Sequence, residues 1–197
     1  MDKIICAGKN YLDHAKEMQE GTPERPVLFL KPPSVLKVCS EWDQTLNLHL
    51  PNLEDEFHYE CELVFQIKNN QLAAVTLGLD MTNRSLQKQA KLSAGPWTLG
   101  KVFKDAACIG PWLPIPPDLA DLHFAFYVND ELKQKAQATD MRMSPDALLA
   151  YAAEYFPICD GDLLFTGTPA GVGRVQPGDR GRLCLNNQHY SVYYLHP

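Results

Sequence analysis

An alternating pattern of apolar and polar residues over 58–67 predicts a β-strand with two different faces. Successive side chains of a strand point to opposite sides of the sheet. One side is expected to be apolar throughout, with Tyr59, Cys61, Leu63, Phe65 and Ile67. The other side carries Glu60 and Glu62, whose carboxylates repel each other unless water or a cation lies between them. Paired oxygen ligands suit a hard divalent cation such as Mg²⁺, although a solvated acidic strand edge has the same spacing.

Other short apolar runs predict a strand-rich fold. We expect strands at residues 4–7, 27–30, 46–50, 72–79, 123–128 and 162–166, and a final pair on either side of Asn186-Asn187. The strand over 27–30 is expected to be buried. Helices are expected at 11–18, at 82–92 and from Ser144 to about Tyr155, with Asn10, Thr82 and Ser144 as their N-caps. Asn129-Asp130 predicts a hairpin turn. Many strands, few helices and no regular βαβ alternation predict a strand-dominated α+β fold.

Composition narrows the class of protein. A chain of 197 residues is long enough for one substantial core and short for two, so we expect a single domain over 1–197. The net charge of −6 argues against a nucleic-acid binder, which would show a basic patch. Apolar runs such as 27–30 are too short to cross a membrane. Scattered cysteines without a CxxC pair, and an N-terminus without a signal-peptide layout, favour a reduced, cytoplasmic location.

The predicted helix over 11–18 carries His14 and Glu17. Residues three apart lie on the same face of a helix, so the carboxylate would orient the imidazole and make it more basic. That is what a general base requires. An exposed pair on a surface helix has the same spacing, so the pattern alone leaves both interpretations open.

Asp80 directly follows the predicted strand over 72–79 and comes just before a predicted helix. This position can aim a third carboxylate at a cation, and it equally suits an aspartate that caps the helix. Arg84 and Gln87 lie one turn apart on that helix, where they would reach an anionic substrate or form a solvated face.

Two more segments are candidates for chemistry. Lys101 lies between bulky apolar residues, which predicts either a partly buried ammonium beside an anion or a lysine that extends to the surface. The loop over 166–173 follows a strand, and glycines such as Gly167 let backbone N–H groups approach a carboxylate or phosphate. The loop lacks the G-K-[ST] element of a Walker loop, and a simple tight turn also fits it.

Taken in order along the chain, these segments resemble the fumarylacetoacetate hydrolase family. The resemblance rests on Gly8-Lys9-Asn10-Tyr11 through His14 and Glu17, Leu28-Phe29-Leu30-Lys31-Pro32, His58-Tyr59-Glu60-Cys61-Glu62-Leu63, Asp80-Met81-Thr82 with Arg84 and Gln87, Pro96-Trp97 with Lys101 and Phe103, and Gly161-Asp162 through Gly173. The joint order of these motifs is specific and covers nearly the whole chain. The short N-terminus and the His14/Glu17 helix resemble the small acylpyruvase and oxaloacetate decarboxylase-like branch.

The resemblance implies a mixed, rolled β-sheet with few short helices, usually in a homodimer. It implies one Mg²⁺ or Mn²⁺ per subunit, bound by Glu60, Glu62 and Asp80. It also implies a mobile lid with the catalytic residues His14 and Glu17, and a small 2-oxo acid substrate surrounded by Lys101, Arg84, Gln87, Gly167 and Thr168.

Three positions depart from the family pattern. Ser85 and Lys104 stand where family members commonly have aspartate, and Asp130 stands where glycine is usual. The first two would change the polar network around the site, and so they bear on substrate choice more than on the class of reaction.

The reaction expected first is metal-dependent cleavage of the C–C bond of acylpyruvates, the 2,4-dioxo acids, to pyruvate and a carboxylic acid. His14, oriented by Glu17, would deprotonate a water, and Lys101 with the metal would hold the pyruvate enolate. Oxaloacetate decarboxylation passes through the same enolate and requires no water. Keto–enol tautomerisation requires fewer chemical steps still, so both reactions stay alternatives. A degenerate binding protein is the non-enzyme alternative, and retention of all these residues argues against it.

Overall fold

The structure is a computed structural model that describes residues 1–11, 25–52 and 54–197. Its largest sheet has seven strands in the order β2-β1-β12-β6-β7-β9-β3. The bounds are β1 Ile4–Gly8, β2 Val27–Lys31, β3 Leu36–Val38, β6 Cys61–Lys68, β7 Gln71–Asp80, β9 Ala107–Ile109 and β12 Leu163–Phe165. The sheet is mixed, since β1 pairs in parallel with β12 and β3 with β9, while the other pairs are antiparallel.

Two smaller sheets complete the strand content. The five-stranded sheet has the order β11-β10-β14-β15-β4, with β4 Thr45–His49, β10 His123–Val128, β11 Glu131–Gln137, β14 Arg180–Leu185 and β15 Gln188–Leu195. The three-stranded sheet has the order β13-β5-β8, with β5 Phe57–Tyr59, β8 Thr82–Asn83 and β13 Gly173–Val175. The described α-helices are α2 Arg84–Leu92, α3 Thr98–Lys101 and α4 Pro145–Ala153, and the 3₁₀ turns are Pro33–Val35, Leu119–Asp121 and Ala138–Asp140. The expected strand-dominated α+β fold is confirmed.

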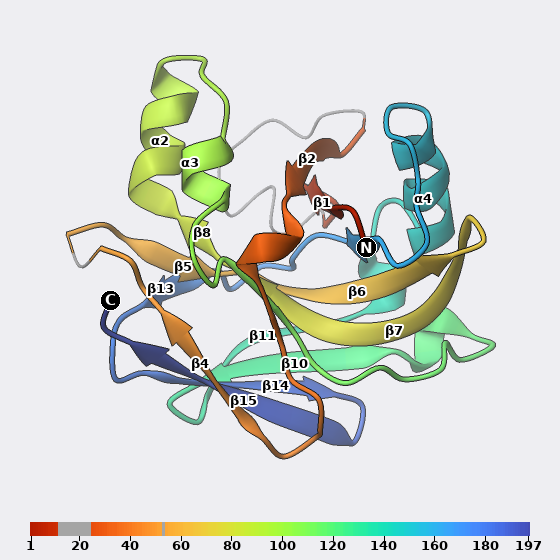
Figure 1. Ribbon diagram of the computed structural model, residues 1–197. Helices are drawn as coiled ribbons and strands as arrows, with labels where there is room; N and C mark the ends of the chain where they lie inside the picture. The colour runs from red at the N-terminus through yellow and green to blue at the C-terminus, as the bar shows by residue number, and fades with distance from the viewer. Residues whose placement is uncertain (12–24, 53) are drawn as a thin grey trace.

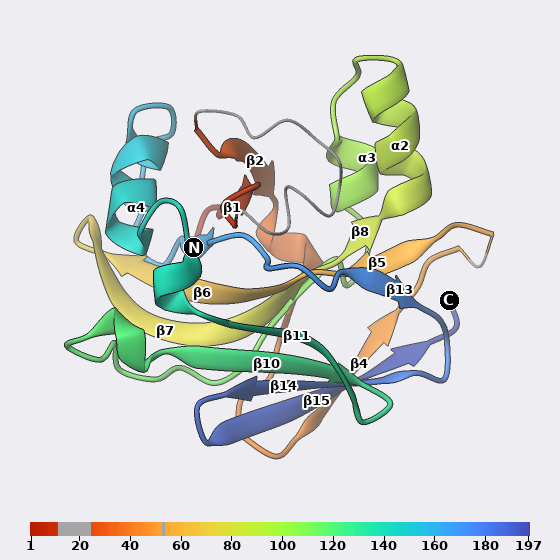
Figure 2. The same cartoon turned by 180° about the vertical axis from the view of Figure 1, so that it is seen from behind.

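The large sheet separates the helices from the five-stranded sheet. In Figure 1 the curved strands β6 and β7 run through the middle, with α2, α3 and α4 on one side and β10, β14 and β15 on the other. The view from behind in Figure 2 shows the same layers. The main core fills the space between the sheets, where Leu63 and Phe65 of β6 join Phe126 and Tyr190. Val64, which points the other way, belongs to a second cluster with strands β1 and β12.

The single strand expected over 58–67 is two strands in the structure. β5 pairs with β13 and β8, whereas β6 pairs with β12 and β7, and Glu60 lies at the break between them. The expected apolar face is confirmed, because the odd-numbered residues from Tyr59 to Ile67 are all buried in the main core. The chain thus changes hydrogen-bonding partners at Glu60 without changing which side chains face inward.

Several local expectations can be compared with the structure. The hairpin at Asn129 and Asp130 is confirmed, and the left-handed φ angles of 50° and 65° are those of a type I′ turn. Ser144 caps α4 as expected, although that helix ends at Ala153. Of the helix expected over 11–18, only Tyr11 lies within the described residues, and it forms an isolated antiparallel β-bridge with Met141.

Two local expectations were wrong. Asn83, not Thr82, caps α2, because the Asn83 side chain accepts a hydrogen bond from Leu86 N while Thr82 belongs to β8. The strand over 27–30 is not fully buried, since β2 lies at the edge of its sheet and Leu30 is 40% exposed.

All six cysteines lie in the described part of the chain, where the structure has them as free thiols. Among the described helices, none has both the length and the apolar composition that a membrane crossing requires.

Candidate active site

Three carboxylates meet where the large and the three-stranded sheets join. Glu60 lies between β5 and β6, Glu62 lies on β6, and Asp80 ends the neighbouring strand β7. The register of β6 and β7 brings Asp80 opposite Glu60, and Asp80 N donates to Glu60 O at 2.9 Å. One oxygen of each carboxylate lies within 4.8 Å of the others, and all three residues are buried. The structure therefore brings together the three acids that the sequence suggested.

Lys101 lies against this cluster. It ends α3 and is buried, and its Nζ donates to Glu60 Oε2 at 2.8 Å, Asp80 Oδ2 at 2.7 Å and Thr82 Oγ1 at 2.7 Å. Burial lowers the pKa of Lys101, but Asp80 and Glu60 outweigh it and the net shift is upward. Lys101 is therefore a fixed ammonium within the site, and the surface-lysine interpretation is wrong.

A second buried lysine, Lys31, was not singled out from the sequence. It ends β2, and its Nζ lies 2.7 Å from Asp80 Oδ1. Its hydrogen bonds go to Met81 O at 3.0 Å and Ala106 O at 2.6 Å. Among the described residues, Asp80 Oδ1 thus has a charged neighbour but no aligned donor. The available signal was the one used for Lys101, a lysine within an apolar segment.

Arg84 and Gln87 also belong to the site. Both lie on α2, where Arg84 Nη1 donates to Gln87 Oε1 at 2.6 Å and Arg84 Nη2 donates to Glu60 Oε1 at 2.7 Å. Their shared helix face, predicted from spacing, is therefore confirmed. It faces the carboxylates, so the solvated-face alternative is excluded.

Gly167 contacts the cluster through its backbone. Its N–H donates to Glu62 Oε2 at 2.8 Å. The residue has a φ of +95°, and a Cβ here would lie 3.0 Å from Asn10 Cβ and 3.1 Å from Ala7 O. Only glycine fits this conformation and this space. The close backbone approach expected of this loop is therefore present, and its partner is a protein carboxylate.

The hydroxyl of Thr168 is used within the protein. Thr168 Oγ1 donates to Cys61 O at 2.9 Å and accepts a hydrogen bond from Gln134 Nε2 at 2.8 Å. The hydroxyl proton is therefore directed at β6, so the side chain secures the loop. Gln134 lies in a polar, lysine-rich strand, and nothing in its local sequence distinguishes it from a solvated residue.

Glu62 is the acid that most needs a cation. Burial raises the pKa of its carboxyl well above the usual range, and the charges of Asp80 and Glu60 raise it further. Burial and like charge make an ionised Glu62 unfavourable, and Asp80 Oδ1 receives no hydrogen bond from the described residues. A cation bound here would supply positive charge to both carboxylates. Carboxylate oxygens from three residues suit Mg²⁺ or Mn²⁺, so the residues present fit the implied metal.

His14 and Glu17 lie outside the described residues. Asn10, two positions before the undescribed residues 12–24, is fully buried, and its amide donates to Thr166 O at 2.9 Å and Met143 O at 3.0 Å. Asn10 Oδ1 also accepts from Met143 N at 3.0 Å. The chain therefore enters the segment beside Thr166, the neighbour of Gly167.

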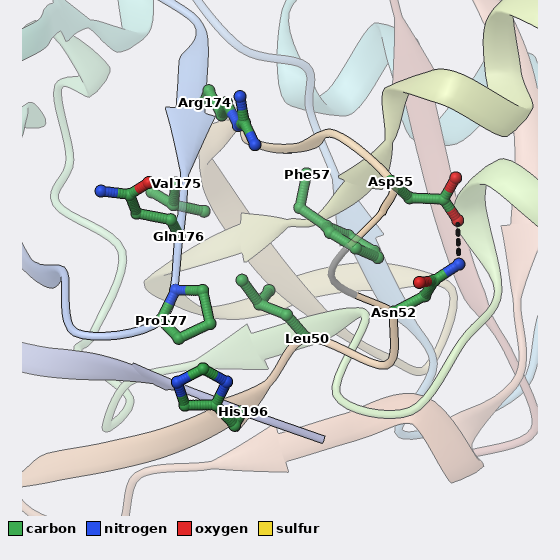
Figure 3. Close-up of a pocket in the computed structure, with 9 residues that line it drawn as sticks. All are labelled: Leu50, Asn52, Asp55, Phe57, Arg174, Val175, Gln176, Pro177 and His196. Carbon is green, nitrogen blue, oxygen red and sulfur yellow. Dashed lines mark hydrogen bonds between the residues drawn. The ribbon is translucent and has the colours of Figure 1, made fainter.

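A separate pocket of about 370 Å³ lies beside the three-stranded sheet (Figure 3). Its lining residues are Leu50, Asn52, Asp55, Phe57, Arg174, Val175, Gln176, Pro177 and His196. None of the acids or cations of the carboxylate cluster lines it. Asp55 accepts hydrogen bonds from Asn52 at 3.2 Å and from Asn83, the cap of α2, at 2.8 Å.

Comparisons with known proteins agree with this geometry. Residues 3–189 match the family described as fumarylacetoacetate (FAA) hydrolase, C-terminal. The mitochondrial oxaloacetate tautomerase FAHD2 of Oryza sativa subsp. japonica is 35% identical over 192 residues, which cover 90% of this chain and 84% of that protein. The oxaloacetate tautomerase YcgM of Escherichia coli is 32% identical over 193 residues, covering 91% and 86%.

A solved structure is also similar over the whole chain. The fumarylpyruvate hydrolase from Pseudomonas aeruginosa, in complex with Mn²⁺ and pyruvate, superposes with a TM-score of 0.93 and 30% identity. The match covers 100% of this chain and 91% of that one. The architecture described above is therefore shared with a protein that holds a divalent metal.

Lys31→Met should lower the free energy of unfolding by about 3 kcal/mol, since Asp80 would keep a buried charge with only Lys101 beside it. Urea denaturation in the presence of EDTA measures this loss. Lys37→Met is the matched control, because Lys37 is 40% exposed and 3.7 Å from Asp105, and it should cost less than about 1 kcal/mol. Equal losses in the two variants would show that the Lys31–Asp80 pair contributes nothing special.

Glu62→Gln should change how stability depends on pH. Because folding raises the Glu62 pKa, the group favours folding fully only below its ordinary pKa of 4.5, and that contribution is lost as pH rises toward the folded pKa. Without metal, the parent should therefore lose melting temperature relative to Glu62→Gln as the pH rises above about 5. Mg²⁺ should restore the parent and not the variant.

The control for this experiment is Glu131→Gln, which changes a carboxylate that is 74% exposed. It should follow the parent at every pH, with and without Mg²⁺. Parallel pH profiles for the parent and Glu62→Gln in EDTA would contradict the assignment of a strained, buried carboxyl.

Proposed function

The chain belongs to the fumarylacetoacetate hydrolase family, and from this we propose that it interconverts the keto and enol forms of oxaloacetate. The observation that supports this most is the buried set of Glu60, Glu62 and Asp80 with Lys101 beside it, in a chain whose relatives include several named oxaloacetate tautomerases. Acylpyruvate cleavage, expected first from the sequence, becomes the second candidate.

The reaction needs positive charge at one oxygen. Tautomerisation moves a proton between C3 and the C2 carbonyl oxygen of the substrate, and negative charge develops on that oxygen as the C–H bond breaks. Fixed cations lower the barrier most where charge develops. When bound, a divalent cation at Glu60, Glu62 and Asp80 supplies Lewis-acid chemistry toward the 2-oxo acid. Lys101 adds a buried ammonium that its carboxylate neighbours keep protonated.

The remaining residues would bind and orient oxaloacetate, which carries two carboxylates. Arg84 presents a guanidinium held by Glu60 and Gln87, and we assign it to a substrate carboxylate. We also assign Gly167 and Thr168 to substrate binding, and the Gly167 N–H fixes Glu62 Oε2. His14, oriented by Glu17, is our candidate for carrying the proton, and Asn10 anchors the chain that leads to it.

Acylpyruvate hydrolysis is the second candidate, and the similarity to a fumarylpyruvate hydrolase favours it. His14 would deprotonate a water, the hydroxide would attack the distal keto carbon, and the C–C bond would break to leave a pyruvate enolate. Lys101 would stabilise that enolate as in tautomerisation. Decarboxylation of oxaloacetate would form the same anion after loss of CO₂. We also propose a homodimer using Mg²⁺ or Mn²⁺, on the basis of the family resemblance, and a cytoplasmic location, on the basis of the scattered cysteines without a CxxC pair.

One set of assays distinguishes these reactions. With Mg²⁺, the parent should speed the keto–enol equilibration of oxaloacetate, followed by the ultraviolet absorbance of the enol, above the rate in buffer. Lys101→Met should reduce it about 10²–10³-fold, because a charge-stabilising donor is lost. Lys88→Met, an exposed lysine on α2, should match the parent.

His14→Ala then tests the proton role that both candidates give to His14. Acetylpyruvate or fumarylpyruvate cleavage should fall about 10²–10⁴-fold if His14 activates water. Metal binding, measured by the Mg²⁺-induced rise in melting temperature, should persist. A parent that cleaves acylpyruvates but leaves the oxaloacetate equilibration rate unchanged would reject the tautomerase and establish the hydrolase.

A further inference from the structure

Gln134 belongs to β11, and its side-chain amide is buried against the loop over 166–169 with all of its donors and its oxygen hydrogen-bonded. It is 1% exposed, although β11 is an edge strand and its other residues are mostly polar. Its Nε2 donates to Thr168 Oγ1 at 2.8 Å and to Pro169 O at 2.8 Å, and its Oε1 accepts from Cys61 N at 3.0 Å. Both ends of the amide are thus used across the gap between the two larger sheets.

These bonds fix the backbone on both sides of Cys61. Gln134 Oε1 accepts a hydrogen bond from Cys61 N. Thr168, which is itself hydrogen-bonded to Gln134, donates to Cys61 O at 2.9 Å. Cys61 is the residue between Glu60 and Glu62, so the two peptide units that carry these acids are both held. The same loop delivers the Gly167 N–H to Glu62 Oε2.

We propose that Gln134 is a positioning residue of the metal site. It acts through Cys61 and Thr168 to set the spacing of Glu60 and Glu62 and the place of the Gly167 N–H. This inference rests on the proposed function only in requiring that the three acids bind a divalent cation. Outer residues that orient metal ligands change affinity even though they never touch the ion.

The contact between β11 and the loop is close enough for this role. Gly171 has a φ of +97°, and a Cβ there would lie 2.0 Å from Lys133 O, so the loop backbone lies directly on β11. An apolar side chain would fill the buried space at position 134 without orphaning polar groups of its own. The amide instead satisfies three polar groups that all belong to the segments carrying Glu60, Glu62 and Gly167.

Gln134→Met tests the proposal, because methionine keeps the length and removes the hydrogen bonds. Calorimetric titration with Mn²⁺ should give a dissociation constant about 10- to 100-fold weaker than that of the parent. Tyr190→Phe is the matched control. It removes another buried hydrogen bond between the sheets, from Tyr190 Oη to Leu77 O at 2.9 Å, without touching the loop. It should lower the melting temperature of the metal-free protein and leave Mn²⁺ affinity unchanged.

Thr168→Val supplies a second, independent variant, since it breaks the same chain of bonds from the loop side. It should weaken Mn²⁺ binding by a similar factor, and the double variant should be little worse than either single one, because both act through one network. Fully multiplicative losses, or a Gln134→Met protein that binds Mn²⁺ as the parent does, would overturn the positioning role. A parent that binds no Mn²⁺ would instead reject the metal site, and the inference with it.

Discussion

Burying three carboxylates within 4.8 Å of one another is the constraint on which this structure depends. Two like charges 4 Å apart repel by about 4 kcal/mol at the effective dielectric near a protein surface. Three such pairs would cost about as much as the whole folding free energy of a domain. Lys31, Lys101 and Arg84 contact Asp80 and Glu60 and offset this repulsion, whereas Glu62 receives a backbone N–H and a raised pKa. The cluster is therefore neutralised unevenly, and Glu62 is the group left for a cation to stabilise.

The fold meets this constraint by bringing distant segments to one junction. Lys31 comes from the edge strand β2, Lys101 from α3, and Gly167 from the loop after β12. The break at Glu60 follows from the same requirement. The chain leaves the three-stranded sheet there and pairs with β7 of the large sheet, whose last residue is Asp80. The sheets thus form a frame that holds Lys31, Lys101 and Arg84 at hydrogen-bonding distance from Asp80 and Glu60.

The acids could be predicted from the sequence because their signal is local. Alternation over 58–67 places Glu60 and Glu62 on one face, Asp80 follows a predicted strand, and the family resemblance joined the three as metal ligands. The break at Glu60 could not be predicted, since the alternation of inward residues continues through it. Gln134 was missed because its role depends on a hydrogen bond to Thr168, which is 34 residues away in the sequence. Thr82 and Asn83 are both good caps, and only tertiary contacts decide between them, because Lys101 occupies the Thr82 hydroxyl.

The proposed reactions share one charged frame and differ in where a proton goes. Tautomerisation, decarboxylation and acylpyruvate cleavage all develop negative charge on the same substrate oxygen, so Lys101 and a cation at the acids would serve each of them. That part of the site therefore cannot by itself select the reaction. Selection must come from the group that delivers or removes a proton and from the access of water, and the proposed mechanism gives the proton role to His14 with Glu17. Asn10 donates to Thr166 O, and the next residue, Gly167, donates to Glu62, so under this proposal the start of the His14 segment and the carboxylate cluster share one loop.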